Sequence, residues 1–195
     1  METTASPVHI YMEANPNPAA LKFVFNTMLL TEGRVMDVPS RAEATGIPIA
    51  EAIFDAFPAV ERVFFAQNFI TITKSTTAAW EELRHEIRSF LLDYAQAGHP
   101  FFAEEPDHEE HEAQPKNPQE ERIQQILSEY VRPAVEMDGG AITFGSFDPE
   151  TGQLSVVLQG SCSGCPSSVI TLKSGIENLF HQLMPEVKSV VAQEG

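Results

Sequence analysis

The stretch Gly160-Ser161-Cys162-Ser163-Gly164-Cys165-Pro166 holds both cysteines of the chain, and its surroundings predict how this part folds. Before it, Leu154–Leu158 alternates as a strand does. After it, apolar residues recur at helical spacing at Val169, Leu172, Ile176, Leu179 and Leu183. Pro166 suits the first position of that helix, because its missing N–H would have had no partner there. We therefore expect the Cys-x-x-Cys pair at a strand-to-helix junction.

The neighbouring sequence extends this pattern into a small mixed unit. The expected elements are a helix with apolar positions Ile123, Ile126, Leu127 and Tyr130, a kink or restart at Pro133, a turn at Met137–Gly140, strands at Ile142–Phe147 and Leu154–Leu158, and a last strand at Val187–Val191. Counting the helix after the cysteines, the predicted order is helix, strand, strand, helix, strand.

The first hundred residues predict a second unit of strands and helices. Strands are expected at Val8–Glu13, Leu21–Asn26, Val60–Ala66 and Asn68–Lys74, and helices at Pro48–Ala56 and along the apolar stripe Trp80, Leu83, Ile87, Phe90, Leu91 and Tyr94. Ten of the thirteen phenylalanines lie within residues 1–102. Such a concentration of large apolar side chains predicts a core of its own.

An acidic, proline-containing stretch separates the two units. Eight acidic residues and one basic residue lie between Ala103 and Glu121, and such a stretch cannot bury itself. We predict an N-terminal domain over residues 1–102, a flexible acidic linker over 103–116 and a C-terminal domain over 117–195, whose first helix opens at Asn117 or Pro118. The predicted fold class is α+β, with two small mixed domains and mainly antiparallel sheets.

Composition narrows the partners that the protein can have. The formal net charge of −16 argues against nucleic acid and against an anionic membrane surface. No apolar run approaches the ~20 residues that a membrane span needs. The first residues, Met1–Pro7, have neither a basic residue nor an apolar stretch, so the sequence predicts a cytoplasmic protein with reduced thiols.

The two cysteines predict thiolate chemistry. A helix N-terminus stabilises anions, and thiolates bind soft metals and iron–sulfur clusters. A Cys-x-x-Cys pair is half of a four-thiolate site, so either the pair acts alone as a redox dithiol or two chains meet to complete the site. A thioredoxin-like dithiol is disfavoured because no aromatic residue precedes Cys162. A zinc site is disfavoured because the nearest following histidine, His181, lies at the far end of the helix.

Two stretches resemble a known family. Val131-Arg132-Pro133-Ala134-Val135-Glu136-Met137-Asp138-Gly139-Gly140 and Leu158–Ser168 resemble the C-terminal domain of NifU-like (Nfu) iron–sulfur scaffold proteins, and the likeness runs from about Arg122 to Val191. Glu13–Phe23 resembles the N-terminal domain of these proteins, with departures at Asn15 and Ala19.

This resemblance implies a function. The family's cluster cysteines correspond to Cys162 and Cys165, which implies a [4Fe–4S] cluster bridging two subunits and a homodimer that forms on cluster binding. It further implies a carrier rather than an enzyme. The expected partners are apo iron–sulfur proteins, which receive the cluster, and cluster-assembly proteins.

Overall fold

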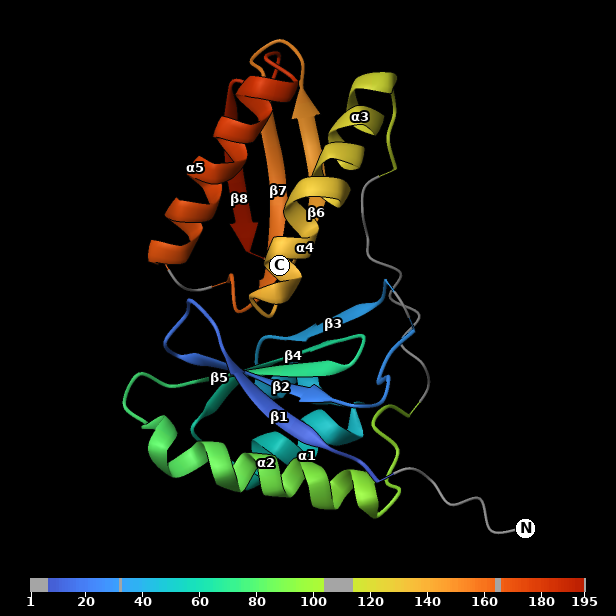
Figure 1. Ribbon diagram of the computed structural model, residues 1–195, viewed down its shortest axis with the longest axis vertical. Coiled ribbons are helices and arrows are strands. Elements are labelled where there is room, and N and C mark those ends of the chain that lie inside the picture. The colour runs from blue at the N-terminus through green and yellow to red at the C-terminus, as the bar shows by residue number, and fades with distance from the viewer. Residues whose placement is uncertain (1–6, 32, 104–113, 164–165, 195) are drawn as a thin grey trace, which may run out of the picture. The chain divides into compact units, whose positions relative to one another are not determined.

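The computed structural model describes residues 7–31, 33–103, 114–163 and 166–194 (Figure 1). The chain divides into two compact units near residue 107, except that Asn15–Asn17 groups with the second unit. Each unit combines helices with a sheet, so the predicted α+β class with mainly antiparallel sheets in two domains is confirmed. The domain boundaries stay a prediction, because most of the expected linker, residues 104–113, lies outside the described residues.

The N-terminal unit is built on a five-stranded antiparallel sheet. Its strands are β1 (Ile10–Ala14), β2 (Ala20–Phe25), β3 (Val35–Val38), β4 (Val60–Ala66) and β5 (Phe69–Lys74), in the order β1-β2-β5-β4-β3. Its helices are the 3-10 turn η1 (Arg41–Ala44), α1 (Pro48–Ala56) and α2 (Trp80–Gln96). In Figure 1, α1 and α2 lie on the same face of this sheet.

Apolar burial between these helices and the sheet explains the N-terminal fold. Ile53, Ile87 and Leu91 from the helices and Phe23 and Phe65 from the strands are fully buried in one cluster. Aromatic rings meet edge to face within it, with ring centroids 5.5 Å apart for Phe57 and Phe90. The concentration of phenylalanine in this half of the chain therefore builds a core, as the composition predicts.

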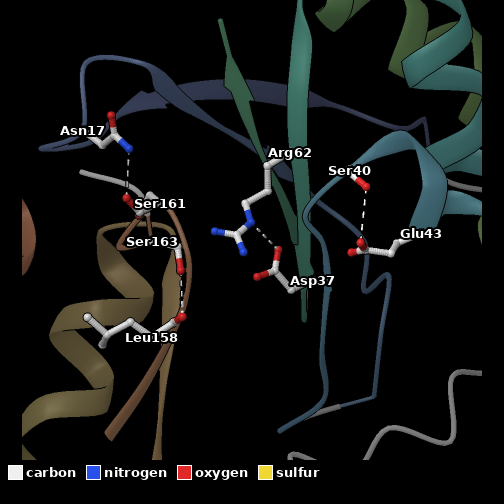
Figure 2. Close-up of polar contacts among 8 residues, drawn as sticks. All are labelled: Asn17, Asp37, Ser40, Glu43, Arg62, Leu158, Ser161 and Ser163. Atoms are coloured by element: carbon white, nitrogen blue, oxygen red, sulfur yellow. Dashed lines mark hydrogen bonds and ion pairs between the residues drawn. The ribbon is translucent and has the colours of Figure 1, made fainter. Parts of the chain in front are cut away.

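Strand β3 and the turn η1 are not anticipated by the sequence pattern. β3 is only four residues long, and its Asp37 breaks the apolar run that strand prediction relies on. The strand pairs along β4, and the Asp37 carboxylate forms an ion pair with the Arg62 guanidinium at 3.1 Å (Figure 2). A charge that looks unfavourable in a strand is thus neutralised by a residue distant in sequence.

The C-terminal unit is a three-stranded sheet with helices. Its elements are α3 (Pro118–Ile126), the π-helical turn η2 (Leu127–Val131), α4 (Arg132–Met137), β6 (Gly140–Asp148), β7 (Gln153–Gly160), α5 (Pro166–Leu183) and β8 (Ser189–Glu194). β6 and β7 are antiparallel, whereas β7 and β8 are parallel, in the order β6-β7-β8. Figure 1 shows α3 and α5 on the same face of this sheet.

The first helical segment starts where the sequence predicts and breaks near the predicted position. The Asn117 side chain accepts hydrogen bonds from the backbone N–H groups of Gln119 and Glu120, which caps α3 at Pro118. The Glu120 carboxylate in turn accepts from the Lys116 N–H at 2.8 Å. The expected break near Pro133 comes slightly earlier, as the π-helical turn η2 that ends at Val131, and the chain restarts as α4 with Pro133 in its first turn.

The C-terminal core includes the first cysteine. Ile123 of α3 and Phe180 of α5 are fully buried against Phe144 of β6 and Val156 of β7, and Cys162 belongs to the same cluster. The end of β7 is therefore anchored in packed apolar surroundings. None of the helices in the described ranges is both long and apolar enough to cross a membrane.

The turn between β6 and β7 allows a prediction about pH. The Asp148 carboxylate accepts hydrogen bonds from the Thr151 hydroxyl and from the Glu150 N–H, which together hold the pKa of Asp148 below its ordinary value of 3.8. A lowered folded-state pKa adds stability above the unfolded pKa and loses it as the pH falls through the folded one. We expect Asp148→Asn to be slightly less stable than the parent at pH 7.

Unfolding midpoints in urea, measured from pH 7 down to below the ordinary aspartate pKa of 3.8, check that expectation. The stability difference between parent and Asp148→Asn should shrink as the solution is acidified below the ordinary aspartate pKa. A difference of constant size from neutral to acid pH would contradict the ionised-carboxylate explanation.

Candidate metal centre

The predicted cysteine loop lies between β7 and α5. β7 ends at Gly160 and α5 begins at Pro166, so the expected strand-to-helix junction is confirmed. Cys162 is described and its side chain is buried, 7% exposed. Cys165, the other predicted ligand, lies outside the described residues.

Gly160 and the serines shape the described part of the loop. Gly160 has a φ of +68°, a conformation that favours glycine, and it turns the chain away from β7. The Ser163 N–H then donates to the Gly160 carbonyl at 3.1 Å. The Ser163 hydroxyl donates back to the Leu158 carbonyl at 2.7 Å (Figure 2). These bonds fold the loop back against the strand that precedes it.

A second turn holds the loop from the side of β6. Gly139 has a φ of +79°, which confirms the predicted turn at Met137–Gly140. The Ser161 hydroxyl donates to the Asp138 carbonyl, and the Ser161 N–H donates to the Gly139 carbonyl at 3.3 Å. The two turns are thus joined by hydrogen bonds, although they lie more than twenty residues apart in the sequence.

The structure gives the serines a role that sequence reasoning missed. Judged from the sequence, the serines beside the cysteines are small residues that leave the sulfurs uncrowded. In the structure, Ser161 and Ser163 are buried hydrogen-bond donors that fix the loop backbone. The Cys162 sulfur lies 3.9 Å from the Ser161 hydroxyl oxygen, within reach of a weak hydrogen bond. The sequence feature that could have indicated this role is the serine on each side of Cys162, close to Gly160.

An apolar groove adjoins Cys162 in the C-terminal unit. Leu172, Ile176 and Leu179 of α5 line it on one side, and Val131 and Ala134 line it on the other. Three further apolar side chains of this unit, Tyr130, Met137 and Ile170, are more than half exposed. The C-terminal unit therefore has apolar surface suited to contact with another protein, and the groove brings part of it to Cys162.

The described residues provide thiolate chemistry but no complete single-chain site. Among the described residues, no three His, Cys, Asp or Glu side chains lie close enough together to hold a metal ion. His181 is exposed at the far end of α5, with its ring Nε2 3.3 Å from the Lys188 carbonyl oxygen. The location of Cys162 just before the N-terminus of α5 suits a thiolate ligand, because that end of a helix favours negative charge.

Comparison with known proteins extends the sequence resemblance. Residues 10–98 match the family model described as "Scaffold protein Nfu/NifU N terminal", and residues 123–191 match the model of the "NifU-like domain". NifU-like protein 4, mitochondrial, from Arabidopsis thaliana is 38% identical over 184 residues, covering 93% of this chain and 64% of that protein. NFU1 iron-sulfur cluster scaffold homolog, mitochondrial, from Drosophila persimilis is 36% identical over 190 residues, with coverage of 93% and 64%.

A solved structure also matches. The solution NMR structure of a NifU-like protein from Saccharomyces cerevisiae has a TM-score of 0.45 and 24% sequence identity, and it covers 54% of this chain and 92% of that one. The chain spans slightly less than two thirds of the length of the Arabidopsis and Drosophila relatives.

These relatives overturn one prediction. The names of the plant and insect proteins say that they are mitochondrial, so the predicted cytoplasmic location is wrong. That prediction rested on the composition of Met1–Pro7. Because the chain matches only part of each relative, those residues are no guide to the presence of a targeting segment.

The assignment to a family rests on both units of the chain. The two family models lie one on each unit and together cover most of the residues, and both relatives match over 93% of the chain. The family resemblance predicted from the cysteine loop and the Met137–Gly140 turn is therefore confirmed, and the chain belongs to the NifU-like (Nfu) family of iron–sulfur cluster scaffold proteins.

Proposed function

We propose that this protein is an iron–sulfur cluster carrier. Two copies hold one [4Fe–4S] cluster through Cys162 and Cys165 of each chain, and the cluster is then passed to apo iron–sulfur proteins. The observation that supports this most directly is the cysteine count: the chain has two cysteines, both in the loop between β7 and α5. In this proposal the cluster is cargo, and the protein is not an enzyme.

The stoichiometry follows from the ligands. A four-iron cluster is held by four thiolates, and each chain supplies two. A two-fold axis through the cluster is the simplest closed arrangement, because each chain then presents the same loop to its partner. The relatives that carry the words "iron-sulfur cluster scaffold" in their names support the same class of cargo.

The loop residues are suited to a carrier. Gly160, Ser161 and Ser163 fix the backbone on both sides of Cys162, so this thiol is held in a defined position. The apolar groove beside Cys162, and the exposed apolar side chains of the same unit, offer contact area for the proteins that donate or receive the cluster. The net charge of −16 disfavours nucleic acid and anionic membranes as partners.

Anaerobic reconstitution tests this proposal. With iron, sulfide and reductant, we expect about two irons and two sulfides per chain, because two chains share one four-iron cluster. A shared two-iron cluster would instead give about one of each per chain. The loaded protein should also activate an iron–sulfur apo-enzyme in proportion to the cluster supplied.

The alternative function is a redox dithiol. In that case the metal-free protein should form a Cys162–Cys165 disulfide and reduce disulfide substrates catalytically. Robust turnover in a disulfide-reductase assay, together with a failure to retain iron, would replace the carrier by this second function.

A further inference from the structure

We propose that Gly140 is a positioning residue for Cys162. Its missing side chain leaves the space that the Cys162 sulfur fills, so that the start of β6 sets where the first cluster ligand lies. The inference rests on the proposed function in one respect, namely that Cys162 is a ligand. The contact between the two residues does not depend on it.

Two glycines face each other at the end of the β6–β7 pair. Gly140, the first residue of β6, pairs directly opposite Gly160, the last residue of β7. Because neither residue has a side chain, the pair itself does not cover the backbone at this end of β6 and β7. Because Gly160 has a positive φ, the chain turns at once and brings Cys162 back beside Gly140.

The distances show that a larger residue would not fit at position 140. A Cβ atom placed there would lie 3.0 Å from the Cys162 Sγ atom and 3.4 Å from its Cβ atom. It would also lie 2.7 Å from the Gln159 carbonyl oxygen. Carbon–carbon contacts are favourable at about 3.5–4.0 Å, so the sulfur already occupies the volume that a methyl group would need.

The cysteine side chain is the more movable of the two obstacles. The Gln159 carbonyl belongs to β7, where Gln159 pairs with Ala141 of β6 and the preceding residue, Leu158, pairs with Glu194 of β8. The Cys162 side chain can change its rotamer, whereas the loop backbone is held by the bonds from Ser161 to Asp138 and Gly139. An added methyl group at position 140 therefore has to displace both the Gln159 carbonyl and the Cys162 sulfur, and the sulfur can yield by a change of rotamer.

Gly145 provides a matched control in the same strand. A Cβ atom there would lie 3.0 Å from the Ser155 carbonyl oxygen and 3.2 Å from the Ser155 hydroxyl oxygen. It would thus crowd the backbone of β7, though less closely than the 2.7 Å contact with the Gln159 carbonyl oxygen at position 140. It meets no cysteine, so Gly145→Ala reports the cost of crowding alone.

The first test uses the reduced, metal-free full-length protein. Alkylation of Cys162 by iodoacetamide, followed by peptide mass spectrometry, measures how accessible its sulfur is. We expect a several-fold faster reaction in Gly140→Ala than in the parent, and an unchanged rate in Gly145→Ala. Equal rates in all three proteins would overturn the proposal, whether or not the protein binds a cluster.

The second test uses the reconstituted protein. A misplaced ligand should weaken cluster retention, and changes in residues that orient metal ligands typically cost about 10- to 100-fold in metal affinity. Loss of the visible absorption to a chelator should therefore be faster in Gly140→Ala than in Gly145→Ala. Equal loss from the two variants would show that Gly140 affects only the sheet. A parent protein that holds no cluster would refute the carrier function and leave the alkylation result intact.

A double-mutant cycle separates the sulfur from the carbonyl. If the methyl group at position 140 collides with the sulfur, then Gly140→Ala should destabilise the parent more than it destabilises Cys162→Ala. The same cycle applies if Gly140→Ala is insoluble, because Cys162→Ala should then restore soluble protein. Additive effects, or no rescue, would assign the whole cost to Gln159 and overturn the proposal.

Discussion

Replacing either Cys162 or Cys165 by serine is expected to abolish the stable cluster. The chain has no other thiol, and each single replacement removes two of the four ligands when two chains share one cluster. Iron and sulfide per chain should fall to background, and the visible absorption of the reconstituted protein should disappear. The serine hydroxyl is a harder and more weakly acidic donor than a thiol, so it does not replace the lost ligand.

The fold should survive these replacements. Serine is nearly the same shape as cysteine, and the bonds that hold the loop backbone run from the Ser161 and Ser163 hydroxyls to backbone carbonyls, without the Cys162 sulfur. Ser163→Ala is the matched control, because it keeps both thiols but removes the bond to the Leu158 carbonyl at a cost of about 1 kcal/mol. We expect that control to load a cluster, whereas a cysteine variant with full iron, sulfide and absorption would eliminate the four-thiolate site.

Local patterns in the sequence predict most of the helices and strands. The helix Pro48–Ala56 and the strand Val60–Ala66 have the bounds that the apolar pattern predicts, because each is short, strongly apolar and bordered by turn residues. The strand-to-helix junction at Pro166 is equally local, since the signal is a proline between two periodic segments. Features of this kind require no knowledge of the rest of the chain.

Features that depend on contacts between residues distant in the sequence could not be predicted from local sequence patterns. Strand β3 is compatible with its Asp37 only because Arg62 lies beside it, and no pattern within four residues signals that pairing. The contact between Gly140 and Cys162 likewise appears only when β6 and β7 are placed in register. The assignment of Cys162 and Cys165 as ligands stays a prediction, which the serine variants test.

The second prediction of large effect is that cluster binding and dimerisation are one event. Each chain supplies two thiolates, so a lone subunit would leave two irons exposed to water or to an external thiol. A second subunit fills those positions. With a charge of −16 on each chain, self-association without the cluster is opposed by repulsion. We therefore expect the metal-free protein to be largely monomeric and the loaded protein to be a dimer.

The size of the effect follows from linkage. A ligand that binds only the dimer stabilises it by RT ln(1 + [L]/Kd), which is about 4 kcal/mol at a thousandfold excess over Kd and corresponds to about a thousandfold shift in the association equilibrium. Removing iron with a chelator should return monomers. Higher salt should modestly favour the dimer, because the Debye length falls from about 10 Å at 0.1 M to about 3 Å at 1 M and screens the repulsion between chains.

Sedimentation equilibrium of metal-free and loaded protein at matched concentration measures this coupling. Cys162→Ser is the control, because it has the surface of the parent but should stay monomeric after iron and sulfide are added. A tight metal-free dimer whose mass is unchanged by the cluster would show that contacts between protein surfaces cause the association. The apolar groove beside Cys162 is one surface that such contacts would use. A mass that doubles on loading in the parent, and not in Cys162→Ser, would tie dimerisation to the thiolates, because the two proteins differ by one sulfur atom per chain.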